Sequence, residues 1–212
     1  MIAERELLEY GVKQLGLTPE AIKINKLLKY TELLLKWNKV YSLTAITNTR
    51  QIVTHHLLDG LTVIPHLSAY DRIIDVGSGM GVPGIIIASW YPNCLVTVLD
   101  SNNKKTAFLQ QVAIELGLTN LDVVTARVES YKPLTPFDLV ISRAFADTSL
   151  FVNLTKHLLQ QNGVFMAMKS EKAMDELNKL PRQYKYDCID VEIPGITDKR
   201  ILVTIQMDIK KY

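Results

Sequence analysis

The stretch that decides the fold runs Ile73-Ile74-Asp75-Val76-Gly77-Ser78-Gly79-Met80-Gly81-Val82-Pro83-Gly84. An apolar run that includes β-branched residues stops at an acid, and four glycines follow within eight positions. The next residues, 85–90, can form a buried helix. A strand, a glycine-rich turn and a helix in this order bring backbone amides close to a polar cofactor, and glycine is needed where a Cβ would block that approach. The alternative is a tight turn between a strand and a helix with no ligand.

The composition is that of an ordinary globular protein: of the 212 residues, 48% are hydrophobic and 22% are charged. The net charge of +2 neither requires nor excludes a nucleic-acid partner. Cys94 and Cys188 have no metal-ligand spacing, so reduced thiols are expected. No apolar run approaches the ~18 residues of a membrane span, and the charged residues at positions 1–6 argue against a signal peptide. We therefore expect a soluble cytoplasmic protein with no membrane partner.

Residues 1–68 are predicted to form a helical extension packed on the main domain, 69–212. One helix is expected to start at Thr18-Pro19-Glu20, with Thr18 as its N-cap. Apolar and small polar side chains then recur at helical spacing on one face, at Ile24, Leu27, Leu28, Thr31, Leu34, Leu35 and Asn38. The other face carries Lys26, Lys29, Lys36 and Lys39. Such a face is usually a solvated surface, with phosphate contact as the alternative. A second helical stretch is expected from Thr49.

From residue 71 the pattern changes to alternating strands and helices. Strands are predicted at 72–76, 95–99, 121–125, 137–141, 164–168, 184–191 and 201–207. Helices are predicted from a Ser101 cap to Gly117 and from Thr148 to Gln160. Successive βα units imply a parallel sheet, whereas the turn at Pro194-Gly195 makes the last two strands antiparallel. The predicted fold is α/β: a mostly parallel seven-stranded sheet with an antiparallel C-terminal hairpin and an N-terminal helical extension.

Asp100 ends the second predicted strand, 23 positions after Gly77. An acid at this place in nucleotide-binding sheets takes ribose hydroxyls, which NAD and S-adenosylmethionine share. The order Gly77-x-Gly79-x-Gly81 departs from the dinucleotide pattern G-x-G-x-x-G, and Asp75 would repel a pyrophosphate but can lie near the sulfonium-bearing amino-acid end of S-adenosylmethionine. The spacing favours a methyltransferase and leaves an NAD-dependent protein as the alternative. The absence of Gly-Lys-Ser/Thr excludes a P-loop NTPase.

Several motifs together resemble the RsmG (GidB) family of bacterial methyltransferases. They are residues 75–84, Leu99-Asp100-Ser101, Ala126-Arg127-Val128-Glu129, Ile141-Ser142-Arg143-Ala144-Phe145-Ala146, Trp37-Asn38, His56-x-x-Asp59 and Lys199-Arg200. The resemblance covers nearly the whole chain, and its most specific segment is 142–146. It implies a Rossmann-like class I methyltransferase that uses S-adenosylmethionine to methylate N7 of a guanine in the 16S ribosomal RNA of the small subunit. The chain departs from the family's usual residues at Ser42, Gly60 and Ser170.

The resemblance also implies which residues hold the cofactor. They are Gly77, Val82, Val128, Glu129, Arg143 and, for the ribose, Asp100. Asp75 and Gly79 complete the expected cofactor set because they belong to the glycine-rich turn.

Guanine N7 carries a lone pair and no proton in the reactive direction, so methyl transfer to it needs no general base. The rate should come from placing N7 in line with the methyl group, an effect on the order of 7–11 kcal/mol. We expect Arg143, Arg127 and Lys169 to act by positioning and electrostatics. Arg127, Lys169 and Arg200 are expected to contact RNA, at guanine O6 or at phosphate. The alternative for Arg143 is a structural ion pair with Asp75 or Glu129.

His56 falls on an apolar helix face and is expected to be a structural histidine rather than a catalyst. The histidines show no ligand spacing, so no metal is predicted. A methyltransferase of another RNA, a small molecule or a protein, and an NAD-binding Rossmann protein, remain as alternatives.

Overall fold

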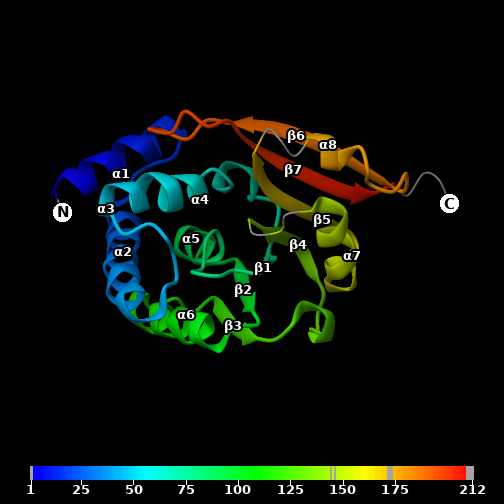
Figure 1. Ribbon diagram of the computed structural model, residues 1–212, viewed down its shortest axis with the longest axis horizontal. Helices are drawn as coiled ribbons and strands as arrows, with labels where there is room; N and C mark the ends of the chain where they lie inside the picture. Colours follow the sequence, from blue (N-terminus) through cyan, green and yellow to red (C-terminus); the bar gives the residue numbers. More distant parts are fainter. Residues whose placement is uncertain (1, 144, 146, 171–173, 209–212) are drawn as a thin grey trace.

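A seven-stranded sheet in the order β3-β2-β1-β4-β5-β7-β6 forms the centre of the molecule (Figure 1). Its strands are β1 (Arg72–Val76), β2 (Leu95–Asp100), β3 (Leu121–Thr125), β4 (Phe137–Ser142), β5 (Leu159–Ser170), β6 (Tyr184–Val191) and β7 (Arg200–Met207). Strands β1 to β5 pair in parallel, whereas β7 is antiparallel to β5 and to β6. The predicted fold class, including the C-terminal hairpin, is therefore confirmed.

The computed structural model describes residues 2–143, 145, 147–170 and 174–208. Ala144 and Ala146 of the segment at 141–146 lie outside the described residues. Within the described part of the chain, no helix combines the length and the apolar character needed to cross a membrane.

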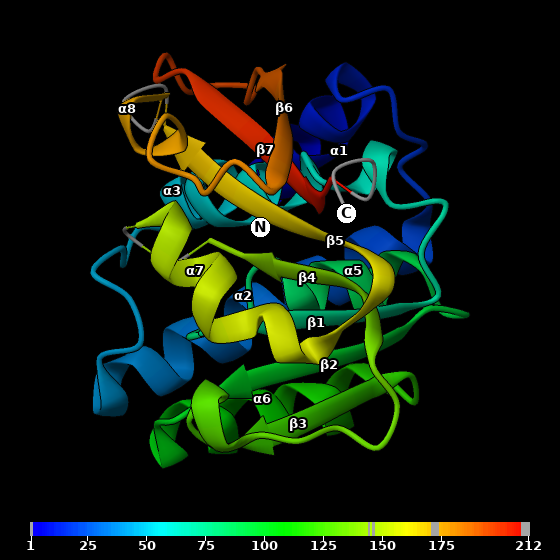
Figure 2. The same ribbon diagram turned by 90° about the vertical axis from the view of Figure 1, so that its right-hand side faces the viewer.

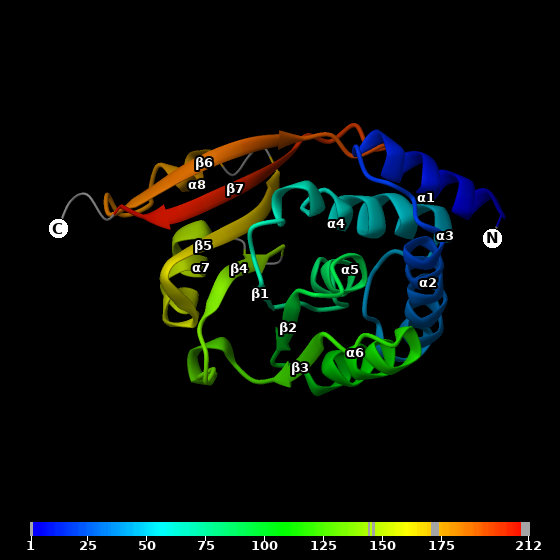
Figure 3. The ribbon, with the colours of Figure 1, turned by 180° about the vertical axis from the view of Figure 1, so that it is seen from behind.

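Helices cover both faces of the sheet. On one face lie α2 (Ala21–Tyr41), α5 (Gly84–Trp90) and α6 (Asn103–Leu116), as Figure 1 and the opposite view in Figure 3 show. The other face carries α7 (Thr148–Thr155), which lies in front of the strands in Figure 2. Each face has its own buried cluster because successive strand residues point to opposite sides: Ile73 belongs to one cluster and Ile74 to the other.

The N-terminal extension consists of short and long helices that pack on the first of these faces. They are α1 (Ile2–Gln14), α2, α3 (Thr49–Ile52), the π-helical η1 (Val53–Leu58), α4 (Asp59–Leu61) and the 3₁₀ turn η2 (Ile64–His66). Leu27 and Leu34 of α2 share one continuous buried cluster with Ile86 of α5 and Phe108 of α6. The division at residue 68 stays a prediction, and the hydrophobic core runs across it.

The two faces of α2 differ as the periodicity predicts. Ile24, Leu27 and Leu34 are fully buried, whereas Lys29 and Lys36 are exposed. Lys29 Nζ lies 3.6 Å from Glu115 Oε2 of α6, a partly exposed pair of the kind that contributes little to stability.

Three predicted helix boundaries are wrong. Helix α2 begins at Ala21 with Glu20 as its N-cap residue and no side-chain cap, so Thr18 is not the cap. Asn102 rather than Ser101 caps α6, because the Asn102 side chain accepts a hydrogen bond from the Lys104 N–H. The predicted helix at 148–160 ends at 155, and β5 begins at 159, because this part of the chain pairs with β4.

Candidate functional site

The glycine-rich turn joins β1 to α5 at the carboxyl edge of the parallel strands. Gly77, Gly79 and Gly81 have φ values of +69°, +62° and +97°, which residues with a Cβ rarely adopt. Gly84 starts α5, and a Cβ at this position would overlap Val98 of β2. The turn therefore needs glycine for backbone conformation at three positions and for space at the fourth.

Asp75, the penultimate residue of β1, holds the turn in place. Its Oδ2 accepts hydrogen bonds from Ser78 Oγ at 2.6 Å and from the Gly84 N–H at 2.9 Å. The side chain is buried, and Oδ1 has no hydrogen-bond partner among the described residues. Burial is the main reason why the pKa of this carboxyl rises to about 6. Asp75 thus organises the turn, and its contact with a cofactor stays a prediction.

Asp100, at the end of β2, connects the same turn to the neighbouring strand. Its Oδ2 accepts from the Gly79 N–H and its Oδ1 from the Asn102 N–H, both at 2.9 Å. Lys105 Nζ lies 3.7 Å from Oδ2. A carboxylate can accept about four hydrogen bonds, so Asp100 keeps acceptor capacity for hydroxyl groups of a ligand.

A cavity beside the glycine-rich turn, here named the glycine-loop cavity, has a volume of about 390 Å³. It is lined by Val76, Gly77, Leu99, Asp100, Ser101, Lys105, Ala126, Arg127, Val128, Glu129, Phe145 and Leu154. Four of the predicted cofactor residues therefore lie together here, namely Gly77, Asp100, Val128 and Glu129. Val82 packs in the hydrophobic core, and Arg143 lines the other cavity. Cofactor contact by these two residues stays a prediction.

A second cavity, here named the arginine cavity, has a volume of about 500 Å³. It is lined by Ile46, His55, His56, Asp59, Arg143, Phe145, Met168, Lys169, Ser170, Glu176 and Arg200. These residues come from the N-terminal extension, from the ends of β4 and β5, from α8 (Met174–Leu177) and from the start of β7. Phe145 lines both cavities, so the two adjoin at this side chain.

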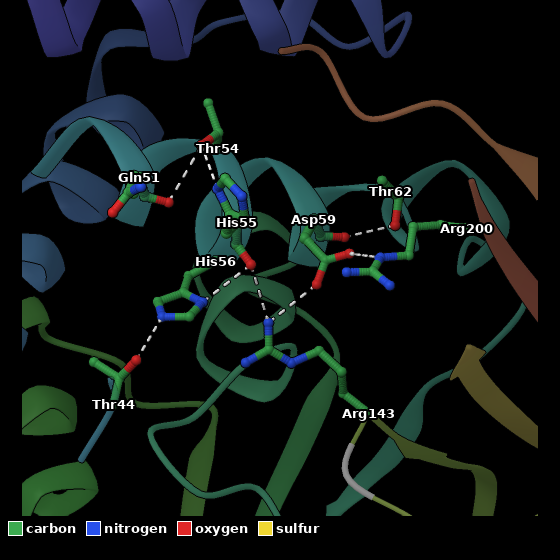
Figure 4. Close-up of polar contacts among 9 residues, drawn as sticks. All are labelled: Thr44, Gln51, Thr54, His55, His56, Asp59, Thr62, Arg143 and Arg200. Atoms are coloured by element: carbon green, nitrogen blue, oxygen red, sulfur yellow. Dashed lines mark hydrogen bonds and ion pairs between the residues drawn. The ribbon is translucent and has the colours of Figure 1, made fainter. Parts of the chain in front are cut away.

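Arg143 follows β4 and points toward the N-terminal extension. Its Nη1 donates to Asp59 Oδ2 at 3.0 Å and to the His55 carbonyl oxygen at 3.3 Å. Arg200 Nε lies 3.8 Å from Asp59 Oδ1, so one carboxylate faces two arginines (Figure 4). Asp59, and neither of the two acids considered from the sequence, is the ion-pair partner of Arg143.

Lys169, near the end of β5, is held by neighbours within the arginine cavity. Its Nζ donates to the Phe145 carbonyl oxygen at 2.8 Å and to Glu176 Oε2 at 2.9 Å, and Glu176 Oε2 also accepts from Thr148 Oγ1 at 3.1 Å. Arg127, in contrast, is exposed and lines the glycine-loop cavity. Of the four predicted cations, three meet in the arginine cavity and Arg127 lies apart from them.

His56 is buried in the wall of the arginine cavity and serves as a hydrogen-bonding link. Its Nδ1 lies 3.0 Å from the His55 carbonyl oxygen and its Nε2 lies 2.9 Å from Thr44 Oγ1. A carbonyl can only accept, so we assign the proton to Nδ1, and Nε2 accepts from the threonine hydroxyl. Burial, and secondly the positive charge of Arg143, lower the pKa of His56 to about 4. These contacts support the expected structural role.

Sequence reasoning assigned no role to three residues that shape the site. Asp59 was named only as part of a motif in the family resemblance, although an acid within the otherwise apolar stretch 57–61 indicates a buried ion-pair partner. Glu176 could not be identified from the sequence, because no spacing rule relates an acid on a helix to Lys169 on a strand. Tyr30 of α2 is fully buried, and its hydroxyl donates to the Met80 carbonyl oxygen of the glycine-rich turn at 2.9 Å. Among the residues that the structure describes, no three His, Cys, Asp or Glu side chains are grouped to hold a metal ion.

Comparison with solved structures identifies proteins of the same fold. The crystal structure of TrmN from Thermus thermophilus matches with a TM-score of 0.58 at 16% identity, covering 81% of this chain and 52% of that chain. Precorrin-6y C5,15-methyltransferase from Geobacter metallireducens matches with a TM-score of 0.54 at 17% identity, covering 78% and 93%. At such identities the likeness shows the fold alone, which is that of the class I methyltransferases.

Comparison of sequences gives a closer relationship. Residues 23–203 match the family described as "GidB: rRNA small subunit methyltransferase G". The protein named ribosomal RNA small subunit methyltransferase G from Chromobacterium violaceum is 45% identical over 197 residues, covering 92% of this chain and 94% of the relative. The protein of the same name from Laribacter hongkongensis is 45% identical over 202 residues, covering 95% and 97%. The chain therefore belongs to the GidB family of rRNA small subunit methyltransferases.

Proposed function

We propose that the protein transfers a methyl group from S-adenosylmethionine to N7 of a guanine in the 16S ribosomal RNA of the small subunit. The observation that carries this proposal is the pair of adjoining cavities at the carboxyl edge of the sheet. One offers Gly77 and the acceptor carboxylate of Asp100, the other offers cations, and Phe145 lines both. Ligands of open α/β sheets bind at this edge. Membership of the family supports the choice of ribosomal RNA as substrate.

The residues present fit S-adenosylmethionine. The volume of the glycine-loop cavity falls within the usual range for small-molecule sites, roughly 300–1,000 Å³. Asp100 would accept from the ribose hydroxyls, and Gly77, Gly79, Val128 and Glu129 would surround the remainder. The buried Oδ1 of Asp75 has no partner among the described residues, but Asp75 lines neither cavity, so its contact with the amino-acid end of the cofactor belongs to this proposal. When bound, this cofactor supplies a methyl group on a positively charged sulfur.

The chain's own residues would act by orientation rather than by proton transfer. Guanine N7 has no proton to remove. His56, one of the two histidines that line the arginine cavity, has a lowered pKa and both ring nitrogens engaged. Arg143 and Lys169 are fixed by hydrogen bonds, which suits groups that must hold the base at O6 while N7 stays accessible. Their contact with the base, and that of Arg127 and Arg200 with RNA, belong to this proposal.

Two measurements test the proposal. S-adenosylhomocysteine should raise the melting temperature of the purified protein and NADH should not, because only a ligand that binds the folded state stabilises it. Incubation with S-adenosylmethionine and unmodified small-subunit RNA, naked or as assembled subunits, should yield 7-methylguanosine by mass spectrometry. Asp100→Ala should lose both effects. Methylation at another atom, of another RNA or of a small molecule only would overturn the assignment of substrate, and stabilisation by NADH alone would overturn the cofactor.

A further inference from the structure

Asp59 lies where three distant segments of the chain meet. It begins α4, its side chain is buried, and its two carboxylate oxygens face Arg143 from the end of β4 and Arg200 from the start of β7 (Figure 4). Nothing derived above for cofactor binding or for base orientation uses this carboxylate directly. Burying a carboxylate costs desolvation energy, so an ion pair of this kind is weak evidence for stability. We therefore consider a role for Asp59 in fixing the positions of the two arginines.

The π-helical turn η1 adds a second acceptor for the same guanidinium. The Asp59 N–H donates to the Thr54 and His56 carbonyls rather than to that of His55. The His55 carbonyl instead accepts from Arg143 Nη1 and from His56 Nδ1. Single π-helical turns occur often at functional sites. Here the turn places a carbonyl and a carboxylate so that Arg143 Nη1 can donate to both.

The two arginines are held to different degrees. Arg143 Nη1 has two acceptors at 3.0 and 3.3 Å, while no hydrogen bond within the described part of the chain involves its Nε or Nη2. Among the side chains that the structure describes, Arg200 has only the longer approach of 3.8 Å to Asp59, and its side chain is 35% exposed. Arg143 is therefore held in one orientation with Nε and Nη2 available to donate to a ligand. Arg200 is held more weakly and can leave Asp59 for another anion.

We propose that Asp59 is a positioning residue: it fixes Arg143 for the guanine base and holds Arg200 in a weak pair that an RNA phosphate replaces. This inference rests on the proposed function. Among the described residues that line the arginine cavity, the three cations Arg143, Lys169 and Arg200 face the two carboxylates of Asp59 and Glu176. Asp59 thus opposes RNA attraction in general while it supports the geometry of the reaction. The base also gains a positive charge on N7 methylation, which a nearby carboxylate favours.

The test measures RNA binding and methylation separately in Asp59→Asn, in the full-length protein. Turnover at saturating RNA should fall on the order of 100-fold because the arginine loses its orientation. RNA affinity at low salt should stay the same or increase, because one negative charge is gone, and affinity for S-adenosylhomocysteine should stay within about twofold. Asp59→Glu keeps the charge and should recover part of the turnover. The matched control is Asp122→Asn, an exposed acid on the edge strand β3. Unchanged turnover, or turnover and RNA affinity lost together in a folded variant, would overturn the inference.

Arg200→Gln provides an independent measurement that does not depend on the folding of the Asp59 variant. RNA affinity should fall, and the slope of log affinity against log salt should become shallower by about one, whereas Arg182→Gln, at an exposed arginine that lines neither cavity, should change neither quantity. An unchanged slope would overturn the assignment of Arg200 to phosphate. If the unaltered protein methylates no guanine N7 of small-subunit RNA, the proposed function fails. If it does so and the variants behave like the control, only the present inference fails.

Discussion

The glycine-loop cavity and the arginine cavity are neighbours that are built in different ways. The first is lined mainly by residues at the carboxyl ends of the neighbouring strands β1, β2 and β3, and its acid Asp100 accepts hydrogen bonds from the backbone N–H groups of Gly79 and Asn102. The second is made of long charged side chains from segments that are far apart in the sequence. The glycine-loop cavity therefore has a shape set by the backbone, whereas in the arginine cavity the positions of the cations depend on the carboxylates that pair with them.

Arg143→Gln should show the largest effect, and it tests directly whether the two cavities have separate roles. Loss of one fixed cationic donor in a catalytic site typically lowers turnover by about 10²–10³-fold. Affinity for S-adenosylhomocysteine should change little, because Arg143 lines the arginine cavity. Single-turnover methylation and ligand titration measure the two quantities, with the exposed Arg182→Gln as control. An equally large loss of cofactor affinity would mean that Arg143 serves both cavities.

Gly84→Ala tests the shape of the glycine-loop cavity. A Cβ here would overlap Val98 and lie 3.0 Å from Asp75 Oδ2, so the free energy of unfolding should fall by about 1–3 kcal/mol and cofactor affinity should fall with it. Chemical denaturation measures the change. Gly117→Asn is the control, because Gly117 has open space and a left-handed conformation that asparagine tolerates. A Gly84 variant as stable as this control would show that the turn can shift without loss.

Two buried groups beside the site, Asp75 and His56, should change the stability of the protein with pH in opposite directions. Asp75 has a raised pKa of about 6 in the folded protein, so the folded state binds the proton more readily and gains about 1 kcal/mol between pH 7 and pH 5. His56 has a lowered pKa of about 4, so the unfolded state binds the proton and the folded state loses about 2 kcal/mol over the same interval. Denaturation at both pH values should show that His56→Gln loses less stability on acidification than the original protein, and Asp75→Asn more. The same slope in all three would contradict both assignments.

Tyr30→Phe should show the smallest effect. It tests the hydrogen bond by which Tyr30 of the N-terminal extension supports the glycine-rich turn. Removal of the hydroxyl leaves the Met80 carbonyl without its partner, at a cost of about 1 kcal/mol of unfolding free energy. Cofactor affinity should weaken a few-fold because the turn is less well supported. Tyr10→Phe, at an exposed position of α1, is the control for thermal melts and titrations. Identical behaviour of the two variants would show that the turn holds its shape without this bond.

The fold was largely predictable because its signals are local. Short apolar runs between turn residues predicted all seven strands, and helical spacing of apolar residues predicted most helices. The lack of a crossover between the last two strands predicted their antiparallel pairing. The errors were at boundaries, where tertiary pairing decides. Residues 156–163 were assigned to helix and loop, yet β5 begins at 159 beside β4. At the start of α2, the threonine that fits a capping pattern is not the residue at which the helix begins.

The sequence predicted residues of the glycine-loop cavity, but it did not predict the ion pairs of the arginine cavity. Gly77 and Asp100 could be grouped because they lie at strand ends of one parallel sheet, which must meet, and the family resemblance added Val128 and Glu129; all four line one cavity. Arg143, Lys169 and Arg200 could be named as cations near strand ends, but their partners could not. Asp59 and Glu176 lie on helices, and no spacing rule relates them to the strands that they face.

The sequence by itself determined the sheet, the glycine-rich turn and the acid that closes β2, because these depend on backbone conformation and on contacts between neighbours in the chain. Only the tertiary structure decided that a carboxylate of the N-terminal extension holds the arginine after β4 and faces the arginine that starts β7. The physical reason is that an ion pair depends on distance in space, while local patterns fix conformation and leave open which distant side chains come within 4 Å.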